Sequence, residues 1–124
     1  MISNMKKLVT EYFRGVDEED INQILSTLKI DCVFSIETHD VLLQGHKQIS
    51  GMFYRLWKNH KWVQHRQFYF VEDLPALEIA VRFQVTNKLL NNKIVLKSNC
   101  NFFTVKKNKF SSIRVYMAGE NTLT

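Results

Sequence analysis

The sequence predicts an α+β fold in which a curved sheet wraps around three helices and leaves a cavity where the two layers meet. Apolar residues recur at helical spacing in three segments, and strand-like segments then follow one another almost to the C-terminus. The links between these strands are short and polar, which favours antiparallel hairpins over crossover connections. A chain of 124 residues, 45% of them apolar, fits a single domain over residues 1–124.

Two helices are expected before the first strand. The first runs from Ile2 to Arg14, because its apolar residues step by three and four: Ile2, Met5, Leu8, Val9, Tyr12 and Phe13. We expect Gly15 to end this helix and Asp17 to cap the second, which runs from Asp17 to Leu28, by accepting a backbone N–H. The second helix has one apolar face, formed by Ile21, Ile24, Leu25 and Leu28.

A third helix and six extended segments follow. The helix spans His46 to Asn59 after a break at Gly45, and its apolar positions are Ile49, Met52, Phe53, Leu56 and Trp57. The expected strands are Cys32–Glu37, Val41–Leu43, Trp62–Glu72, Leu77–Leu89, Lys93–Val105 and Phe110–Met117.

Alternation along the strands predicts which side faces the helices. Ile79, Val81, Phe83 and Val85 share one face of their strand, and polar residues share the other. The runs Phe68–Val71 and Phe102–Phe103 are apolar in succession, which is typical of a sheet covered on both faces. We expect the helices to cover one face and a second copy of the chain to cover the other, which makes a homodimer.

Composition argues against several classes of protein. No apolar run is long enough to span a bilayer, and the N-terminus lacks the pattern of a secretory signal, so we expect a cytoplasmic protein without a membrane partner. The formal charge is +5, but the lysines are spread along the chain and arginine is scarce, which argues against nucleic-acid binding. Cys32 and Cys100 lack zinc-site spacing and are interpreted as reduced core thiols.

Several passages carry a resemblance to a known family. Tyr12–Ile21 contains an aromatic helix end followed by an acidic turn, Leu28–Phe34 places an acidic residue before the first strand, and Gly45–Ile49 opens the third helix with a basic residue. Together these passages resemble the SnoaL-like branch of the nuclear transport factor two superfamily. The closing segments Phe102–Val105, Lys109–Phe110 and Tyr116–Met117 are similar to the last hairpin of that family.

The resemblance implies a cone-shaped, strongly bent antiparallel sheet with three N-terminal helices packed over its concave face, and a pocket inside. Similar proteins are commonly homodimers, and we expect no cofactor. They include ketosteroid isomerases, polyketide cyclases, epoxide hydrolases, dehydratases and proteins that only bind, so the fold alone does not fix an activity.

The resemblance also suggests catalytic residues. Tyr12 matches the tyrosine that donates a hydrogen bond to the developing oxyanion in ketosteroid isomerases. The general base of those enzymes matches Ile36 or, with a slip of one residue, Glu37, which would have to point inward to act. Their second oxyanion donor aligns with Cys100, a weak donor, and the acid of polyketide cyclases aligns near Ala118, two residues before Glu120.

Histidines and asparagines add further candidates. His39 follows Glu37 by two residues, so in extended backbone the two side chains would share a face and form an acid/base pair. His65 begins a long strand and could reach the cavity, but no spacing of His39, His65 and Glu37 matches a known metal-ligand motif, so no metal site is predicted. Asn99 and Asn101 share one face and Ser98 and Cys100 the other, and the sequence leaves open which pair faces the pocket.

The sequence therefore supports a small-molecule-binding pocket protein, with Tyr12, Glu37 and His39 as catalytic candidates for proton transfer on an apolar carbonyl substrate. The residues expected to line the pocket are Phe34, Phe53, Trp57, His65, Asn99, Cys100, Asn101, Phe102 and Met117. The alternative is a homodimer that binds a ligand or a protein without catalysis. A cavity filled by its own aromatic side chains would favour this alternative.

Overall fold

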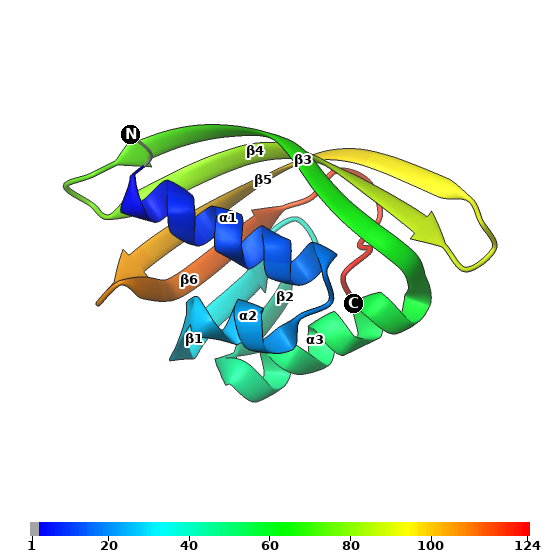
Figure 1. The fold of residues 1–124 in the computed structure, drawn as a ribbon, viewed down its shortest axis with the longest axis horizontal. Helices are drawn as coiled ribbons and strands as arrows, with labels where there is room; N and C mark the ends of the chain where they lie inside the picture. Colours follow the sequence, from blue (N-terminus) through cyan, green and yellow to red (C-terminus); the bar gives the residue numbers. More distant parts are fainter. Residues whose placement is uncertain (1–2) are drawn as a thin grey trace.

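The computed structural model describes residues 3–124 and contains three helices and six strands (Figure 1). In chain order they are α1 (Asn4–Asp17), α2 (Ile21–Ser26), β1 (Leu28–Ile36), β2 (Val41–Gln44), α3 (Gly45–Asn59), β3 (His60–Asp73), β4 (Glu78–Leu89), β5 (Ile94–Lys106) and β6 (Lys109–Tyr116). The predicted start of the first helix, Ile2, lies outside the described residues.

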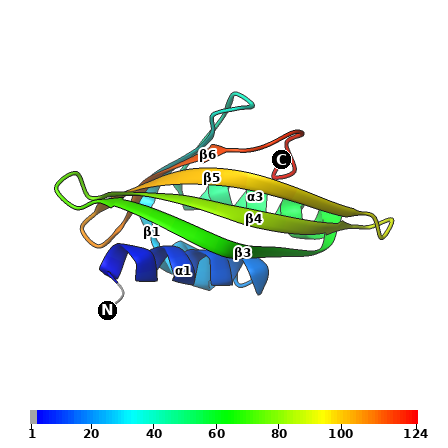
Figure 2. The same ribbon diagram turned by 90° about the horizontal axis from the view of Figure 1, so that it is seen from above.

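The six strands form one curled, open sheet in the order β2-β1-β6-β5-β4-β3, and the helices pack against its concave side (Figures 1 and 2). The predicted α+β cone is confirmed. One pairing departs from the expected antiparallel pattern, because β1 runs parallel to β6, with Phe34 opposite Ile113 and Ile36 opposite Val115. Short links force neighbours to be antiparallel, but β1 and β6 are separated by most of the chain, so no hairpin fixes their direction.

The link between the first two helices differs from the prediction. The α1 helix continues through Gly15 to Asp17, and Asp20 instead of Asp17 caps α2 by accepting a hydrogen bond from the backbone N of Gln23 at 3.1 Å. The chain turns at Glu19, which has a φ of 55°. Leu28, predicted in the second helix, begins β1.

Gly15 is required by a close approach of α2 and not by the end of α1. A Cβ at this position would lie 2.8 Å from Cγ1 of Ile24 and 3.0 Å from the Ile24 backbone nitrogen. The first distance is shorter than real Cβ contacts and the second is tighter than most of them. The backbone of Ile24 cannot move without shifting the whole of α2.

Replacing Gly15 with alanine is therefore expected to lower the free energy of unfolding by about 1–3 kcal/mol. Urea denaturation measures this change. The matched control is Gly51→Ala in α3, where the new Cβ would meet only the end of the Arg55 side chain, at 3.3 Å. This control should gain up to about 1 kcal/mol, because alanine is the better helix former. Equal stability of the two variants would contradict the interpretation of Gly15.

The hydrophobic core lies between the helices and the concave face of the sheet. Ile79, Val81, Phe83 and Val85 are all buried, which confirms the predicted inner face of β4. On the opposite face, Phe102 and Tyr116 are each 42% exposed, with ring centroids 5.7 Å apart. Within residues 3–124, no helix is long and apolar enough to cross a membrane.

Both cysteines are free thiols, but only one belongs to the core. Cys32 is buried in β1, whereas Cys100 lies half-buried on the convex face of β5. Burial, reinforced by the charge of Asp31, raises the pKa of Cys32 to about 12, so this thiol stays protonated near neutral pH.

Candidate functional site

A cavity lies between the helices and the concave face of the sheet. The volume that the centre of a water-sized molecule can occupy in this cavity is about 30 Å³. This volume is roughly a tenth or less of that of pockets that hold drug-sized ligands. Its walls come from α1, α3, the sheet and the segment after β6. The lining residues are Tyr12, Phe13, Val16, Phe34, Phe53, Leu56, Val63, His65, Phe83, Val85, Asn87, Asn99, Asn101, Val115, Met117, Thr122 and Leu123.

Seven of the residues that the sequence singled out line this cavity. They are Tyr12, Phe34, Phe53, His65, Asn99, Asn101 and Met117. The strand register settles the question that the sequence left open, because Asn99 and Asn101 face inward, opposite Phe83 and Val81 of β4. Oδ1 of Asn99 also accepts a hydrogen bond from the backbone N of Ala118 at 2.9 Å, which ties β5 to the segment after β6.

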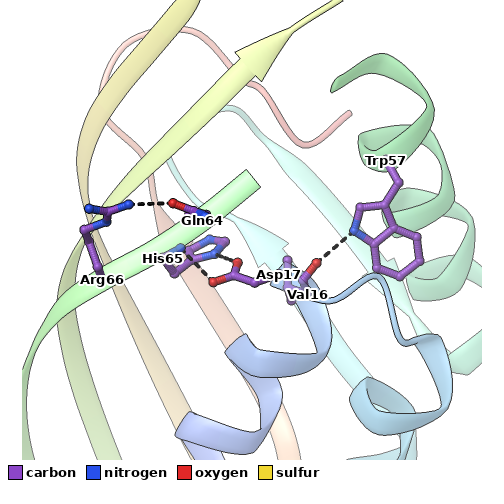
Figure 3. Close-up of polar contacts among 6 residues, drawn as sticks. All are labelled: Val16, Asp17, Trp57, Gln64, His65 and Arg66. Carbon is purple, nitrogen blue, oxygen red and sulfur yellow. Dashed lines mark hydrogen bonds and ion pairs between the residues drawn. The ribbon is translucent and has the colours of Figure 1, made fainter. Parts of the chain in front are cut away.

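The other five lie elsewhere in the fold. Trp57 stacks on Phe53 with ring centroids 5.9 Å apart and donates from Nε1 to the Val16 carbonyl at 3.0 Å, behind the cavity wall (Figure 3). Cys100 and Phe102 alternate with the asparagines and point to the convex face.

The remaining two, Glu37 and His39, belong to the turn after β1. Glu37 is exposed, whereas Ile36 before it is buried, so the inward position at the end of β1 is apolar. Nε2 of His39 donates to the Gly119 carbonyl at 2.9 Å, so this histidine anchors the segment after β6.

Asp17 pairs with His65, a residue of the cavity lining (Figure 3). Nδ1 of His65 donates to Oδ1 of Asp17 at 2.6 Å, and the backbone N of His65 donates to Oδ2 at 2.8 Å. The two side chains are 9% and 23% exposed. Because the carboxylate holds the proton on Nδ1, the neutral ring presents its lone pair at Nε2. One carboxylate thus fixes the position and the tautomer of a histidine that lines the cavity.

Aromatic rings hold this imidazole in place. The ring centroid of Phe13 lies 4.7 Å from that of His65, and the centroid of Phe83 lies 5.3 Å from it. Both phenylalanines line the cavity. The imidazole is therefore flanked by apolar surface, which excludes water and strengthens any electrostatic interaction that it makes with a guest.

Tyr12 supplies a neutral hydrogen-bond donor. Its ring is 2% exposed and lies edge-on to Phe53 and Phe103, with centroids 6.1 and 5.5 Å away. Burial, and secondarily the neighbouring Cys32 thiol, raises the pKa of Tyr12 well above its usual range. The phenol therefore remains protonated, so it can donate a hydrogen bond but cannot act as a base near neutral pH.

Comparisons with known proteins identify the fold. Neither a protein-family model nor a curated protein sequence matches the chain. Among solved structures, a candidate polyketide cyclase from Xanthomonas campestris superposes with a TM-score of 0.84 at 14% identity, over 91% of this chain and 89% of that one. A candidate SnoaL-like polyketide cyclase from Shewanella denitrificans gives a TM-score of 0.80 at 14% identity, over 91% and 89% of the two chains. The chain has the SnoaL-like fold.

The same fold occurs with different ligands. A protein from Catenulispora acidiphila with a ketosteroid isomerase-like fold, solved in complex with trimethylamine, matches with a TM-score of 0.80 at 12% identity, over 89% of this chain and 84% of that one. At these identities the comparisons establish the SnoaL-like, nuclear transport factor two-like architecture, and the site must be argued from its own residues.

Two residues of the site, Asn87 and Asp17, were not predicted from the sequence. Asn87 lies two residues beyond Val85 on the inner face of β4, so extending the alternation by one step would have found it. Asp17 was interpreted as a helix cap. The dipole of a helix disfavours a carboxylate at its C-terminal end. Such a position would have indicated another role for Asp17, but it can be recognised only when the end of α1 is known.

The C-terminal wall of the cavity had no sequence signal. Thr122 and Leu123 follow the last strand and face the cavity without pairing to any strand. The backbone N of Thr122 contacts the sulfur of Met117 at 3.4 Å, and Nζ of Lys97 donates to the Glu120 carbonyl. These contacts each join a side chain to the backbone and are not strand pairing. They follow no periodic pattern in the sequence, so the sequence could not predict them.

Proposed function

We propose that this protein binds a small molecule with an apolar body in the cavity and transfers a proton on it. The pairing of Asp17 with His65, which lines the cavity, carries this proposal. His65 acts as the acid/base, Asp17 positions it, and Tyr12 is the neutral donor. This assignment moves the acid/base role from Glu37 and His39, which do not line the cavity, to a histidine that does.

The chemistry that suits these groups is proton transfer next to a carbonyl. Nε2 of His65 removes a proton from the carbon beside the carbonyl, the electron pair moves onto the carbonyl oxygen, and the Tyr12 hydroxyl donates a hydrogen bond to the resulting enolate. The imidazolium then returns the proton to another carbon. The net reaction is an isomerisation that consumes no other reactant, which agrees with a site built from one base and one neutral donor.

Ligand entry requires the wall to move, because the cavity is small. Met117, Thr122 and Leu123 line the cavity and belong to no helix or strand, so displacing this segment costs the least secondary structure. The candidate polyketide cyclases of the same fold support a ligand of this general kind.

Isomerisation of cyclohex-3-enone to its conjugated isomer, followed by ultraviolet absorbance, tests the proposal. We expect turnover by the wild type and a loss of about 10²- to 10⁴-fold in His65→Gln, the range that a general base contributes. His46→Gln is the matched control, because His46 bonds the Leu28 carbonyl away from the cavity. Loss of turnover in Glu37→Gln, with His65→Gln unaffected, would return the role to the turn after β1.

The small volume of the cavity also favours a second candidate, a homodimer without catalysis. The convex face of the sheet exposes large apolar side chains that a second copy could cover, namely Tyr69, Val71, Leu96, Phe102 and Tyr116. Failure of the wild type to accelerate any small enone, together with a dimer in solution that dissociates in a Phe102→Asp, Tyr116→Asp variant, would favour this function.

A further inference from the structure

Two buried amide oxygens in the cavity wall have no hydrogen-bond partner within the described part of the chain. They are Oδ1 of Asn87 and Oδ1 of Asn101. The two residues are only 1% and 3% exposed, and both line the cavity. Buried acceptors without a partner are rare and cost free energy, so a donor from outside the chain is the simplest explanation for them.

The two oxygens belong to neighbouring strands and are offset along the sheet. Asn101 of β5 lies opposite Val81 of β4, whereas Asn87 lies on β4 itself, six residues further along that strand. Six residues of strand span about 20 Å, and the bend of the sheet brings the inward-facing side chains closer together than that. The cavity wall therefore has two hydrogen-bond acceptors that are separated along the strands.

The middle of the cavity is mainly apolar. Phe83 and Val85 lie between the two positions on β4, and the Asn99 oxygen on β5 is already bonded to the backbone of Ala118. The lining contains no lysine, arginine, aspartate or glutamate, and the carboxylate behind it, Asp17, is paired with His65. Lys97, a buried cation on the inner face of β5 outside this lining, already donates to the Glu120 carbonyl. A charged guest would therefore lack a free counter-ion in the lining, and burying an unpaired charge is costly.

We propose that the ligand is an uncharged, elongated molecule with an apolar middle and a hydroxyl or N–H donor at each end. Asn87 accepts a hydrogen bond from one end and Asn101 from the other, and these two residues determine specificity. The proposal rests on the proposed function, because it requires a guest in this cavity. It adds the chemical class of that guest.

Three probes of equal shape test the proposal by isothermal titration calorimetry. They are 4,4′-dihydroxybiphenyl, 4-hydroxy-4′-methylbiphenyl and 4,4′-dimethylbiphenyl, in which each hydroxyl is replaced in turn by a methyl group. We expect the affinity of the wild type to fall about tenfold with each replacement, because each one leaves a buried oxygen unpaired. This ordering is measured on the wild type, so it does not depend on the folding of any variant.

Variants then assign each end. In Asn87→Leu and in Asn101→Leu, we expect the diol to lose its advantage over the monohydroxy probe, and in the double variant all three probes should bind alike. Ser98→Ala, on β5 but on the convex face, is the matched control and should keep the ordering of the wild type. Thermal melts of each variant confirm that it is folded.

Equal affinity of the wild type for all three probes would overturn the proposal and leave ligand binding intact, because water would then satisfy the two oxygens. Unchanged ordering in the double variant would overturn it as well. Binding of none of the probes, with turnover of cyclohex-3-enone retained, would overturn this inference and leave the proposed function in place. Absence of both binding and turnover would overturn the two together.

Discussion

Replacing Asp17 with alanine is expected to lower the free energy of unfolding by about 2–4 kcal/mol. The Asp17 carboxylate accepts from both the ring and the backbone of His65, so one substitution removes two charge-assisted hydrogen bonds. It also leaves a backbone N–H of β3 without its partner. These bonds join the C-terminal end of α1 to the sheet, so their loss weakens the packing of the helix as well as the histidine. Urea denaturation measures the loss.

The neighbouring carboxylate provides the control for this experiment. Glu18 lies one residue further along, and its contact with Arg14 is 3.9 Å long between side chains that are 63% and 57% exposed. Such an exposed pair contributes little, so Glu18→Ala should change stability by less than about 0.5 kcal/mol. An Asp17→Ala variant as stable as Glu18→Ala would show that the pair with His65 does not hold α1 to the sheet.

Asp17→Asn separates the structural from the catalytic role of this carboxylate. The amide has the same shape as the carboxylate, so part of the stability should be retained. Its N–H can donate to Nδ1, however, and the proton of the imidazole then moves to Nε2, where the lone pair is needed. Turnover of cyclohex-3-enone should fall nearly as far as in His65→Gln while the protein stays folded. Full activity in Asp17→Asn would remove the positioning role.

The fold could be predicted from the sequence because its signals are local and periodic. Helical spacing in Ile49–Trp57 and alternation in Ile79–Val85 each fix a buried face, and short polar links fix the hairpins. The parallel pairing of β1 with β6 has no such signal, because it joins distant segments. Gly15 was misinterpreted for a related reason, since the contact that requires a glycine comes from Ile24 on another helix.

The site was only partly predictable. Tyr12 and His65 stand on elements with a clear inner face, so their place in the wall follows from periodicity. Glu37 lies where the strand ends and the alternation stops, and its exposure depends on how the turn leaves the sheet. The partner of His65 could not be predicted, because Asp17 and His65 are brought together only when the end of α1 reaches β3.

Phe53→Ala is expected to lower the free energy of unfolding by about 3–5 kcal/mol. The side chain is 1% exposed, stacks on Trp57, and lies edge-on to Tyr12 and Phe34 with ring centroids 6.1 and 6.3 Å away. Removing the ring leaves a void because these neighbours are themselves fixed by packing. The void opens into the cavity, so the same substitution should increase the affinity for 4,4′-dihydroxybiphenyl.

Phe110→Ala distinguishes these two effects. Phe110 is also fully buried, packed on Phe103 with ring centroids 4.7 Å apart, but it does not line the cavity. We expect a similar loss of stability in urea and no gain in affinity for the diol, because the new void is separate from the binding space. If both variants lose stability and neither binds the diol more tightly, the volume around Phe53 does not limit binding. Movement of Thr122 and Leu123 would then control access to the cavity.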